Sequence, residues 1–250
     1  MNALTLPTRK DEAWRYSDVD AVAHIWPTPP AETIDVAAGE AVTRLILQQA
    51  GAEAVVVQDY AITLAPGARC DFFVLNTGGK LGRIAIDVTL HEGAHFELGG
   101  AILGGGAQTL EIVTTLRHVE PNATSNQTVR SVLAGRATGN YLGKVMVARD
   151  AQKTDASQSV KAMLLDRTAT ANAKPELEIF ADDVKCAHGA AIGELDQQGL
   201  FYLMSRGLPP AEAKALMLRA FIAGAFEAVA DDAEREQIET AAIAALEKML

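Results

Sequence analysis

The feature that most constrains the fold of this sequence is a short turn that recurs at a nearly constant interval through its first half. Its centres are Gly39, Gly67, Gly93 and Asn122. Successive centres lie 28, 26 and 29 residues apart, and Gly and Asn adopt a left-handed backbone at low cost. The same interval predicts further turns at 151–153 and 183–185. Turns that repeat with a fixed period indicate a solenoid, in which successive coils stack on one another.

Alternating apolar and polar residues flank these turns, as expected for strands with one buried face. Residues 84–90 precede the turn at Gly93, and residues 110–116 precede the next turn. Residues 41–50 fit a helical period almost as well, and we assign them to a strand because Gly39 begins the turn series. The pattern predicts a mainly β solenoid. A β-sandwich with coincidental turn spacing is the alternative.

The solenoid pattern divides the chain into three parts. We expect an N-terminal irregular or helical segment (1–34), a β-solenoid core (35–200) and a C-terminal helical domain (201–250). Four prolines exclude a long element from the first part: Pro7, Pro27, Pro29 and Pro30.

The C-terminal part is predicted to form two helices. Pro209-Pro210 suits a helix start, and one apolar face is predicted from Leu216, Met217, Ala220, Phe221 and Gly224. Asp231 caps a second amphipathic segment, whose apolar positions are Ile238, Ala241, Ala242, Ala245 and Met249. The helices either cover the open end of the solenoid or offer a groove to a partner, and the pattern does not separate these two roles.

Charge and hydropathy exclude two classes of partner. The net charge is −10 and no basic run occurs, which argues against nucleic-acid binding because phosphates require clusters of Lys and Arg. The most apolar segment, 215–230, is interrupted by Arg219 and Glu227, so we expect no membrane span. The N-terminus has no apolar stretch of signal-peptide length. We therefore expect a cytoplasmic protein.

Residues 91–95, His-Glu-Gly-Ala-His, match the H-E-x-x-H pattern of zinc peptidases. That motif binds zinc on a helix, where its two histidines share one face. Here Gly93 lies at a repeat turn, and on a strand the two histidines would lie about 13 Å apart. Nitrogens that share a zinc ion lie within about 4 Å of each other. We expect neither zinc binding by His91 and His95 nor peptidase activity.

Two glycine-rich segments are weaker candidates for ligand binding. Residues 139–145 lack one spacer and the final Ser or Thr of a phosphate-binding loop. The three glycines at 104–106 suit a turn between coils. Because no Ser/His/Asp set stands out either, we predict that the chain is not an enzyme.

Cys186 and His188 are the strongest candidate site residues. Two positions apart on a strand, they point to the same face. One interpretation is a small buried Cys beside a hydrogen-bonded His. The other is a soft metal-ligand pair at a surface edge that awaits ligands from another chain. Cys70 is the only other cysteine, so the chain cannot form a closed metal site or a disulfide framework unaided.

The segment around this pair resembles the SufB/SufD family of iron–sulfur cluster assembly proteins, in its SufD form. The resemblance is carried by residues 175–190 and by the segment Leu-Phe-Tyr-Leu-Met-Ser-Arg-Gly-Leu at 200–208. Residues 7–16 resemble the segment that precedes the family's β-helix. Four further residues fit the family: His118, Pro121, Thr124 and Ser125. The resemblance covers residues 7–228.

This resemblance implies a right-handed parallel β-helix with helical ends, in agreement with the repeat. It implies a scaffold subunit that works with a SufB-like β-helix subunit and with a SufC-like ATPase docked on the C-terminal helices. It also implies that His188 is a metal ligand in nascent cluster assembly, with Cys186 beside it, at the joint with the partner chain. The iron–sulfur cluster is transient in the assembled complex, and no cofactor is expected to stay bound to the isolated chain.

Two departures from the family bear on these expectations. Longer members carry a helical region before the segment matched by residues 7–16, and only six residues precede it here. SufB-like cysteines are missing between Gly135 and Phe180, which favours the SufD form. The alternatives are a homodimeric β-helix that stores or delivers iron and a β-helix enzyme. Sugar-active β-helices gather aromatic side chains, and aromatics form only 5% of this chain.

Overall fold

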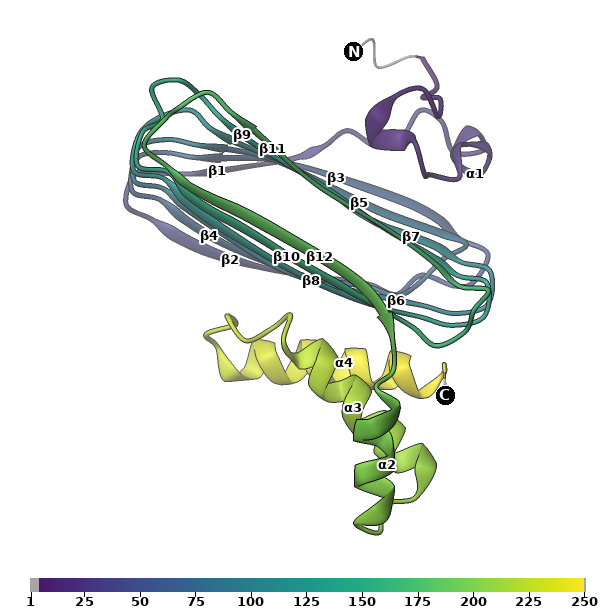
Figure 1. Cartoon of the computed structure of the whole chain (residues 1–250). Helices are drawn as coiled ribbons and strands as arrows, with labels where there is room; N and C mark the ends of the chain where they lie inside the picture. Colours follow the sequence, from purple (N-terminus) through teal and green to yellow (C-terminus); the bar gives the residue numbers. More distant parts are fainter. Residues whose placement is uncertain (1–4, 250) are drawn as a thin grey trace.

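The computed structural model describes residues 5–249 and contains a parallel β-helix flanked by helices (Figure 1). Twelve strands form two six-stranded sheets, which face each other across the interior. Sheet A has the order β1-β3-β5-β7-β9-β11, and sheet B has the order β12-β10-β8-β6-β4-β2. Each coil contributes one strand to each sheet. This confirms the expected β-helix and excludes a β-sandwich.

The strands and helices lie close to the expected boundaries. The strands are β1 (Glu32–Val36), β2 (Ala41–Gln48), β3 (Val55–Leu64), β4 (Arg69–Asn76), β5 (Leu81–Leu90), β6 (His95–Gly104), β7 (Thr109–His118), β8 (Thr124–Leu133), β9 (Thr138–Val147), β10 (Asp155–Leu164), β11 (Thr170–Ile179) and β12 (Lys185–Glu194). The helices are a 3-10 turn η1 (Glu12–Trp14), α1 (Val19–Ala23), α2 (Gln197–Ser205), α3 (Pro210–Ala223) and α4 (Asp232–Glu247). Residues 41–48 are a strand, as assigned from Gly39.

Stacked left-handed residues make the corners of the coils. The turn centres have φ between 62° and 73°, and the series is Gly39, Gly67, Gly93, Asn122 and Lys153. Each centre donates its backbone N–H to a carbonyl oxygen of the following turn, at distances from 2.6 to 3.1 Å. The last of these acceptors is Asp183. The sequence repeat is therefore a ladder of hydrogen bonds that runs along one edge of the β-helix.

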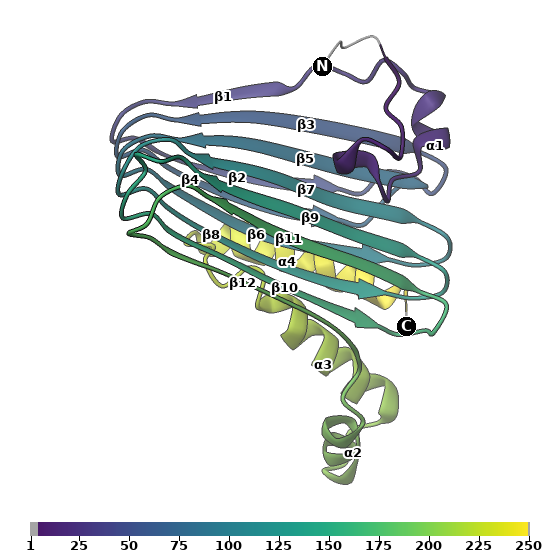
Figure 2. The ribbon, with the colours of Figure 1, turned by 45° about the horizontal axis from the view of Figure 1, so that its top comes forward.

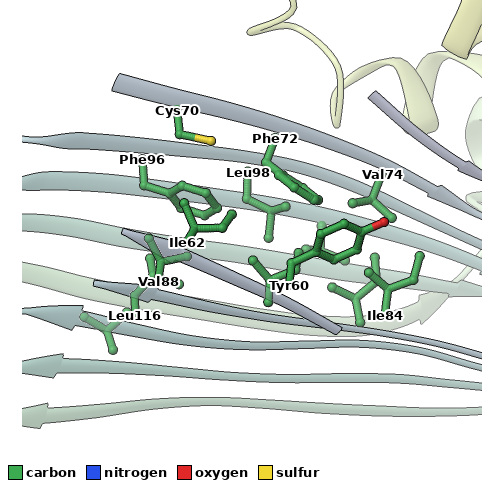
Figure 3. Packing of buried hydrophobic residues seen from close by; sticks show 14 of the residues in the cluster. Tyr60, Ile62, Cys70, Phe72, Val74, Ile84, Val88, Phe96, Leu98 and Leu116 are labelled. Carbon is green, nitrogen blue, oxygen red and sulfur yellow. The ribbon is translucent and has the colours of Figure 1, made fainter. Parts of the chain in front are cut away.

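Side chains of like kind stack in register inside the coils. One interior row in sheet A consists of Ile34, Ile62, Val88, Leu116, Val145 and Leu177. Aromatic residues fill the interior of the early coils, where the rings of Tyr60 and Phe72 meet edge to face with centroids 5.1 Å apart (Figure 3). Burial of such side chains, at about 25 cal/mol per Å² of apolar surface, is the main stabilising contribution.

The N-terminal segment is packed on the outer face of sheet A. Its residues Trp14 and Trp26 lie against Val57 and Leu81 of the sheet. The Arg83 guanidinium lies 3.8 Å from the centroid of the Trp14 ring. Although this segment is irregular, it is part of the folded unit.

Helices α3 and α4 lie on the outer face of sheet B, where they form a second apolar cluster. Leu218, Ile222 and Phe226 pack there with Phe73 and Val132. Of the two roles that the sequence left open, covering the open end does not apply, since these helices cover a flat face of the solenoid (Figure 1). Among residues 5–249, no helix is long and apolar enough to cross a membrane.

Two details of the helical region differ from the sequence analysis. Leu216 and Ala220 of the predicted apolar face are exposed, whereas Leu218 and Ile222 are buried. Only sheet B defines which face of α3 is covered, and that face is rotated from the predicted one. Helix α2 begins at Gln197, a few residues before the expected boundary at 201, and its N-cap is Asp196, whose side chain accepts a hydrogen bond from the Gln198 N–H.

Candidate functional site

One end of the β-helix is an open pair of sheet edges formed by β11 and β12 (Figure 2). Within residues 5–249, strand β12 pairs only with β10, so one row of its backbone groups has no strand partner there. Nine of its ten residues are exposed, which means that neither face of this strand is covered. Three large apolar side chains are also exposed at this end: Ile179, Phe180 and Ile192. An unpaired apolar edge is a surface on which another strand can pair.

Both predicted site residues lie on this edge strand. In the register of β12 with β10, Cys186 pairs with Ala156 and His188 pairs with Gln158. Cys186 is half-buried and packs against the interior cluster, so the strand alternation also directs His188 toward the interior face. His188 is exposed. The structure thus places the thiol and the imidazole on one face of one strand, at the open end.

Cys186 and His188 differ in burial. Burial is the largest cause that raises the pKa of the Cys186 thiol above its ordinary value. Within residues 5–249, His188 makes no side-chain hydrogen bond. The structure therefore shows an exposed His188, and it leaves the ring nitrogens of this residue open to a ligand or a hydrogen-bond partner.

Polar side chains fill the interior beneath this end, where the early coils have aromatic and aliphatic ones. Gln127 Oε1 accepts hydrogen bonds from Thr114 Oγ1 at 2.7 Å and from Tyr141 Oη at 3.0 Å. Gln158 lies in the same row, paired with Gln127 on one side and His188 on the other. The sequence analysis missed these glutamines because a single amide in an alternating strand carries no motif.

The other candidates from the sequence are structural. His91 lies before a turn and His95 begins β6, so neither is on a helix. His95 Nδ1 lies 2.7 Å from Thr124 Oγ1, and His91 Nδ1 lies 3.2 Å from Glu120 Oε1. Residues 139–145 lie in strand β9. The segment 104–106 forms a coil corner, with Gly106 at positive φ.

Cys70 is a core residue. It is completely buried in the interior of the early coils (Figure 3). Burial raises the pKa of its thiol to about 12, so the nucleophilic, metal-binding thiolate is strongly disfavoured. Across residues 5–249, no group of three or more His, Cys, Asp or Glu side chains is arranged to hold a metal ion.

The far side of the helical region carries an exposed apolar surface, here called the α2 patch. Helix α2 projects away from the sheets (Figure 2) and has no buried residue. The patch consists of Phe201, Tyr202, Met204 and Leu216. Phe201 is 71% exposed, which is an unusual position for a phenylalanine on a folded surface.

Fold and site together define a class: parallel β-helix proteins with a Cys and a His two residues apart on an open sheet edge. A family model described as SUF system FeS cluster assembly, SufBD core domain, matches residues 31–221. The chain belongs to this family of iron–sulfur cluster assembly proteins.

Curated relatives agree with this family. The chain is 35% identical over 125 residues to the iron–sulfur cluster assembly protein SufD of Escherichia coli, covering 50% of this chain and 30% of that protein. It is 33% identical over 181 residues to an iron–sulfur cluster assembly SufBD family protein of Synechocystis, covering 72% and 40%. It is 38% identical over 151 residues to the chloroplastic protein ABCI7 of Arabidopsis thaliana, covering 59% and 31%. The matches span less than half the length of these relatives.

Proposed function

We propose that this chain is a SufD-like scaffold subunit for iron–sulfur cluster assembly, which acts in the cytoplasm with a SufB-like subunit and a SufC-like ATPase. The observation that carries the proposal is the exposed edge strand β12, which bears Cys186 and His188 on an uncovered interior face. The chain itself performs no catalytic turnover in this proposal. Its role is to supply ligands and binding surfaces.

The SufB-like partner pairs with the open end of the β-helix. Pairing would satisfy the free backbone groups of β12, and it would bury Ile192, which is 50% exposed. Both effects favour association. The N-terminal end is a poorer candidate because the edge strand β2 is partly covered by α4 and is half-buried along much of its length.

In this proposal the nascent cluster is assembled at the interface between β12 and the SufB-like partner. Iron in iron–sulfur clusters is usually held by thiolates, and His can replace Cys on one iron. His188 offers an exposed ring nitrogen, and Cys186 offers a thiol that must lose its proton to bind. Two ligands are too few to hold a cluster. We therefore expect the remaining ligands to come from the partner and no stable cluster on the isolated chain.

The ATPase docks on the α2 patch. Aromatic side chains with little conformational freedom are typical anchors of protein interfaces. Phe201 and Tyr202 are adjacent in sequence, and both are exposed on a helix that packs mainly against α3. Helices α3 and α4 connect this surface to sheet B. Movement of the ATPase would in this way reach the β-helix.

A homodimer is the second candidate assembly. The open edge of β12 can pair with the same edge of another copy, because a two-fold interface uses one surface twice. Such a dimer would bring two copies of His188 together and would suit iron storage or delivery. Light scattering of the chain alone and with its SufB-like partner separates the two assemblies.

The test of the proposal is the variant His188→Ala, produced together with the native SufB-like and SufC-like partners. We expect an unchanged thermal midpoint and unchanged complex formation, since His188 is exposed, but loss of the iron and sulfide that co-purify with the complex. His91→Ala is the matched control, because His91 is also on the surface but far from β12. Unchanged iron and sulfide in the His188 variant would contradict the proposal.

A further inference from the structure

Gln158 is a buried side chain without a hydrogen-bond partner. It is 3% exposed, and neither its Nε2 nor its Oε1 has a partner in the part of the chain that the structure describes. Four other amide side chains among residues 5–249 are buried: Gln48, Asn76, Gln127 and Asn140. Each of them makes side-chain hydrogen bonds. An unpaired buried amide is costly, so its position beneath the open end calls for a partner.

The rows of the β-helix restrict what that partner can be. Gln158 has two neighbours in its row, Gln127 on one side and His188 on the other, each about 4.8 Å away along the sheet. Gln127 Oε1 already accepts two hydrogen bonds, which uses both of its lone pairs. Gln127 Nε2 has no partner, so Gln127 can only donate toward Gln158. Gln158 Oε1 has a second lone pair, which can accept a hydrogen bond from His188.

His188 is free to make this contact. Its side chain is exposed and lies with Gln158 on the lining of one open pocket of about 350 Å³. A rotation of the ring brings one ring N–H to Gln158 Oε1. A histidine that binds a metal through one nitrogen usually donates the other ring N–H to a fixed acceptor, which sets its tautomer and its direction.

We infer that Gln158 is the positioning residue for His188: its amide oxygen accepts the hydrogen bond of one ring N–H and directs the other nitrogen toward the open end. The inference rests on the proposed function for its purpose, since the directed nitrogen is the one that would meet iron. The hydrogen bond itself requires neither iron nor a partner. Gln158 then holds the imidazole from inside the β-helix.

The tautomer of His188 tests this inference on the isolated full-length chain. Nitrogen-15 shifts of the ring are measured about two pH units above the ordinary imidazole pKa, and the His188 signal is identified by its loss in His188→Gln. Gln158→Leu removes the acceptor, and we expect a roughly fivefold change in the tautomer ratio, which is the value of one ordinary net hydrogen bond. Gln158→Glu keeps an acceptor, and we expect the wild-type tautomer.

Gln127→Leu is the matched control, because it removes a buried glutamine of the same row that lies two strands away from His188. It is expected to lower the thermal midpoint and to leave the His188 tautomer unchanged. Gln158→Leu should fold, since replacing an unpaired buried amide by an apolar side chain is nearly neutral or stabilising. An unchanged tautomer ratio in Gln158→Leu overturns the inference, as does a change of the same size in Gln127→Leu or in Gln158→Glu.

The failure of this inference and the failure of the proposed function are distinguishable. If Gln158→Leu leaves the tautomer unchanged while His188→Ala still loses iron and sulfide, only the positioning role is lost. If His188→Ala keeps its iron and sulfide while Gln158→Leu shifts the tautomer, the hydrogen bond stands and the assembly role fails. In the complex, Gln158→Leu is expected to lower the iron and sulfide content roughly tenfold or more.

Discussion

Arg83 Nη1 lies 2.6 Å from Glu111 Oε2, and both side chains are almost completely buried on the outer face of sheet A. Trp14 covers the guanidinium, and Asn140 Nδ2 donates to the second carboxylate oxygen, Glu111 Oε1, at 2.9 Å. A buried pair of this kind is sensitive to the loss of one member, because the remaining charge has no water to solvate it.

Replacing Arg83 by Met should therefore destabilise the chain by about 3–5 kcal/mol. Urea unfolding measures this loss. The matched control is Arg117→Met, because Arg117 pairs with Asp87 on an exposed part of the same outer face and such pairs contribute about 0–1 kcal/mol. A double variant, Arg83→Met with Glu111→Leu, should recover much of the loss. Equal losses in the Arg83 and Arg117 variants would contradict this assignment.

Gly93 lies at a left-handed corner, so we expect that a larger residue there strains the backbone without a steric clash. Its φ is +64°, and an added Cβ would meet no atom within 4 Å. Gly93→Ala should destabilise by about 1 kcal/mol, and Gly93→Asn by less, because Asn tolerates this region and already occupies the equivalent corner at Asn122. Thermal unfolding of both variants measures the difference. A larger loss for Asn than for Ala would show that space, and not φ, limits this corner.

His118 makes the stability of the chain depend on pH. Its ring is buried, which lowers its pKa to about 4 from the ordinary value near 6.5. As the pH falls, the unfolded chain takes up the proton first, so stability is full above about pH 6.5 and declines toward pH 4 by on the order of 3 kcal/mol. Urea unfolding of His118→Gln across this range should show a shallower decline than that of the wild type. Carboxylates contribute to both curves, so the difference between the two curves reports on His118. An equal decline in both proteins would contradict this role.

A substitution in the α2 patch should weaken binding of the SufC-like ATPase without affecting folding. Phe201→Ser should change the free energy of unfolding by less than about 0.5 kcal/mol, because the ring is exposed. It should weaken binding of the SufC-like ATPase by roughly 30-fold or more, as expected for an aromatic anchor. Calorimetric titration measures the affinity. Phe180→Ser is the control, because Phe180 is also exposed but lies beside the open end, and it should leave ATPase binding intact.

The sequence predicted the β-helix because each corner imposes a requirement on one residue. Gly39, Gly67, Gly93 and Asn122 could be recognised as a series, since few residue types accept a positive φ. Lys153 has no such preference, and only the interval pointed to its corner. The buried face of α3 could not be predicted, because Leu216 and Leu218 are equally apolar and only the position of sheet B decides between them.

The site could be predicted in part for a similar reason. Cys186 and His188 carry a recognisable local segment, whereas Gln158 gains its meaning from a neighbour 30 residues away in the register of β10 and β12. Helix α2 was not among the two predicted helices. It buries no residue, so the apolar face by which the other helices were recognised is not defined by packing here.

The open end of the β-helix determines when Cys186 and His188 are held in fixed positions. In a stack of coils each coil is held only by its neighbours, and β12 has a neighbour on one side alone. Its amide protons should exchange with solvent first, followed by those of β11, so the free chain frays from this end. Cys186 and His188 thus lie on β12, the strand that we expect to open most easily. A partner strand added beyond β12 would act as the next coil, so that docking and ordering of the ligands become a single event.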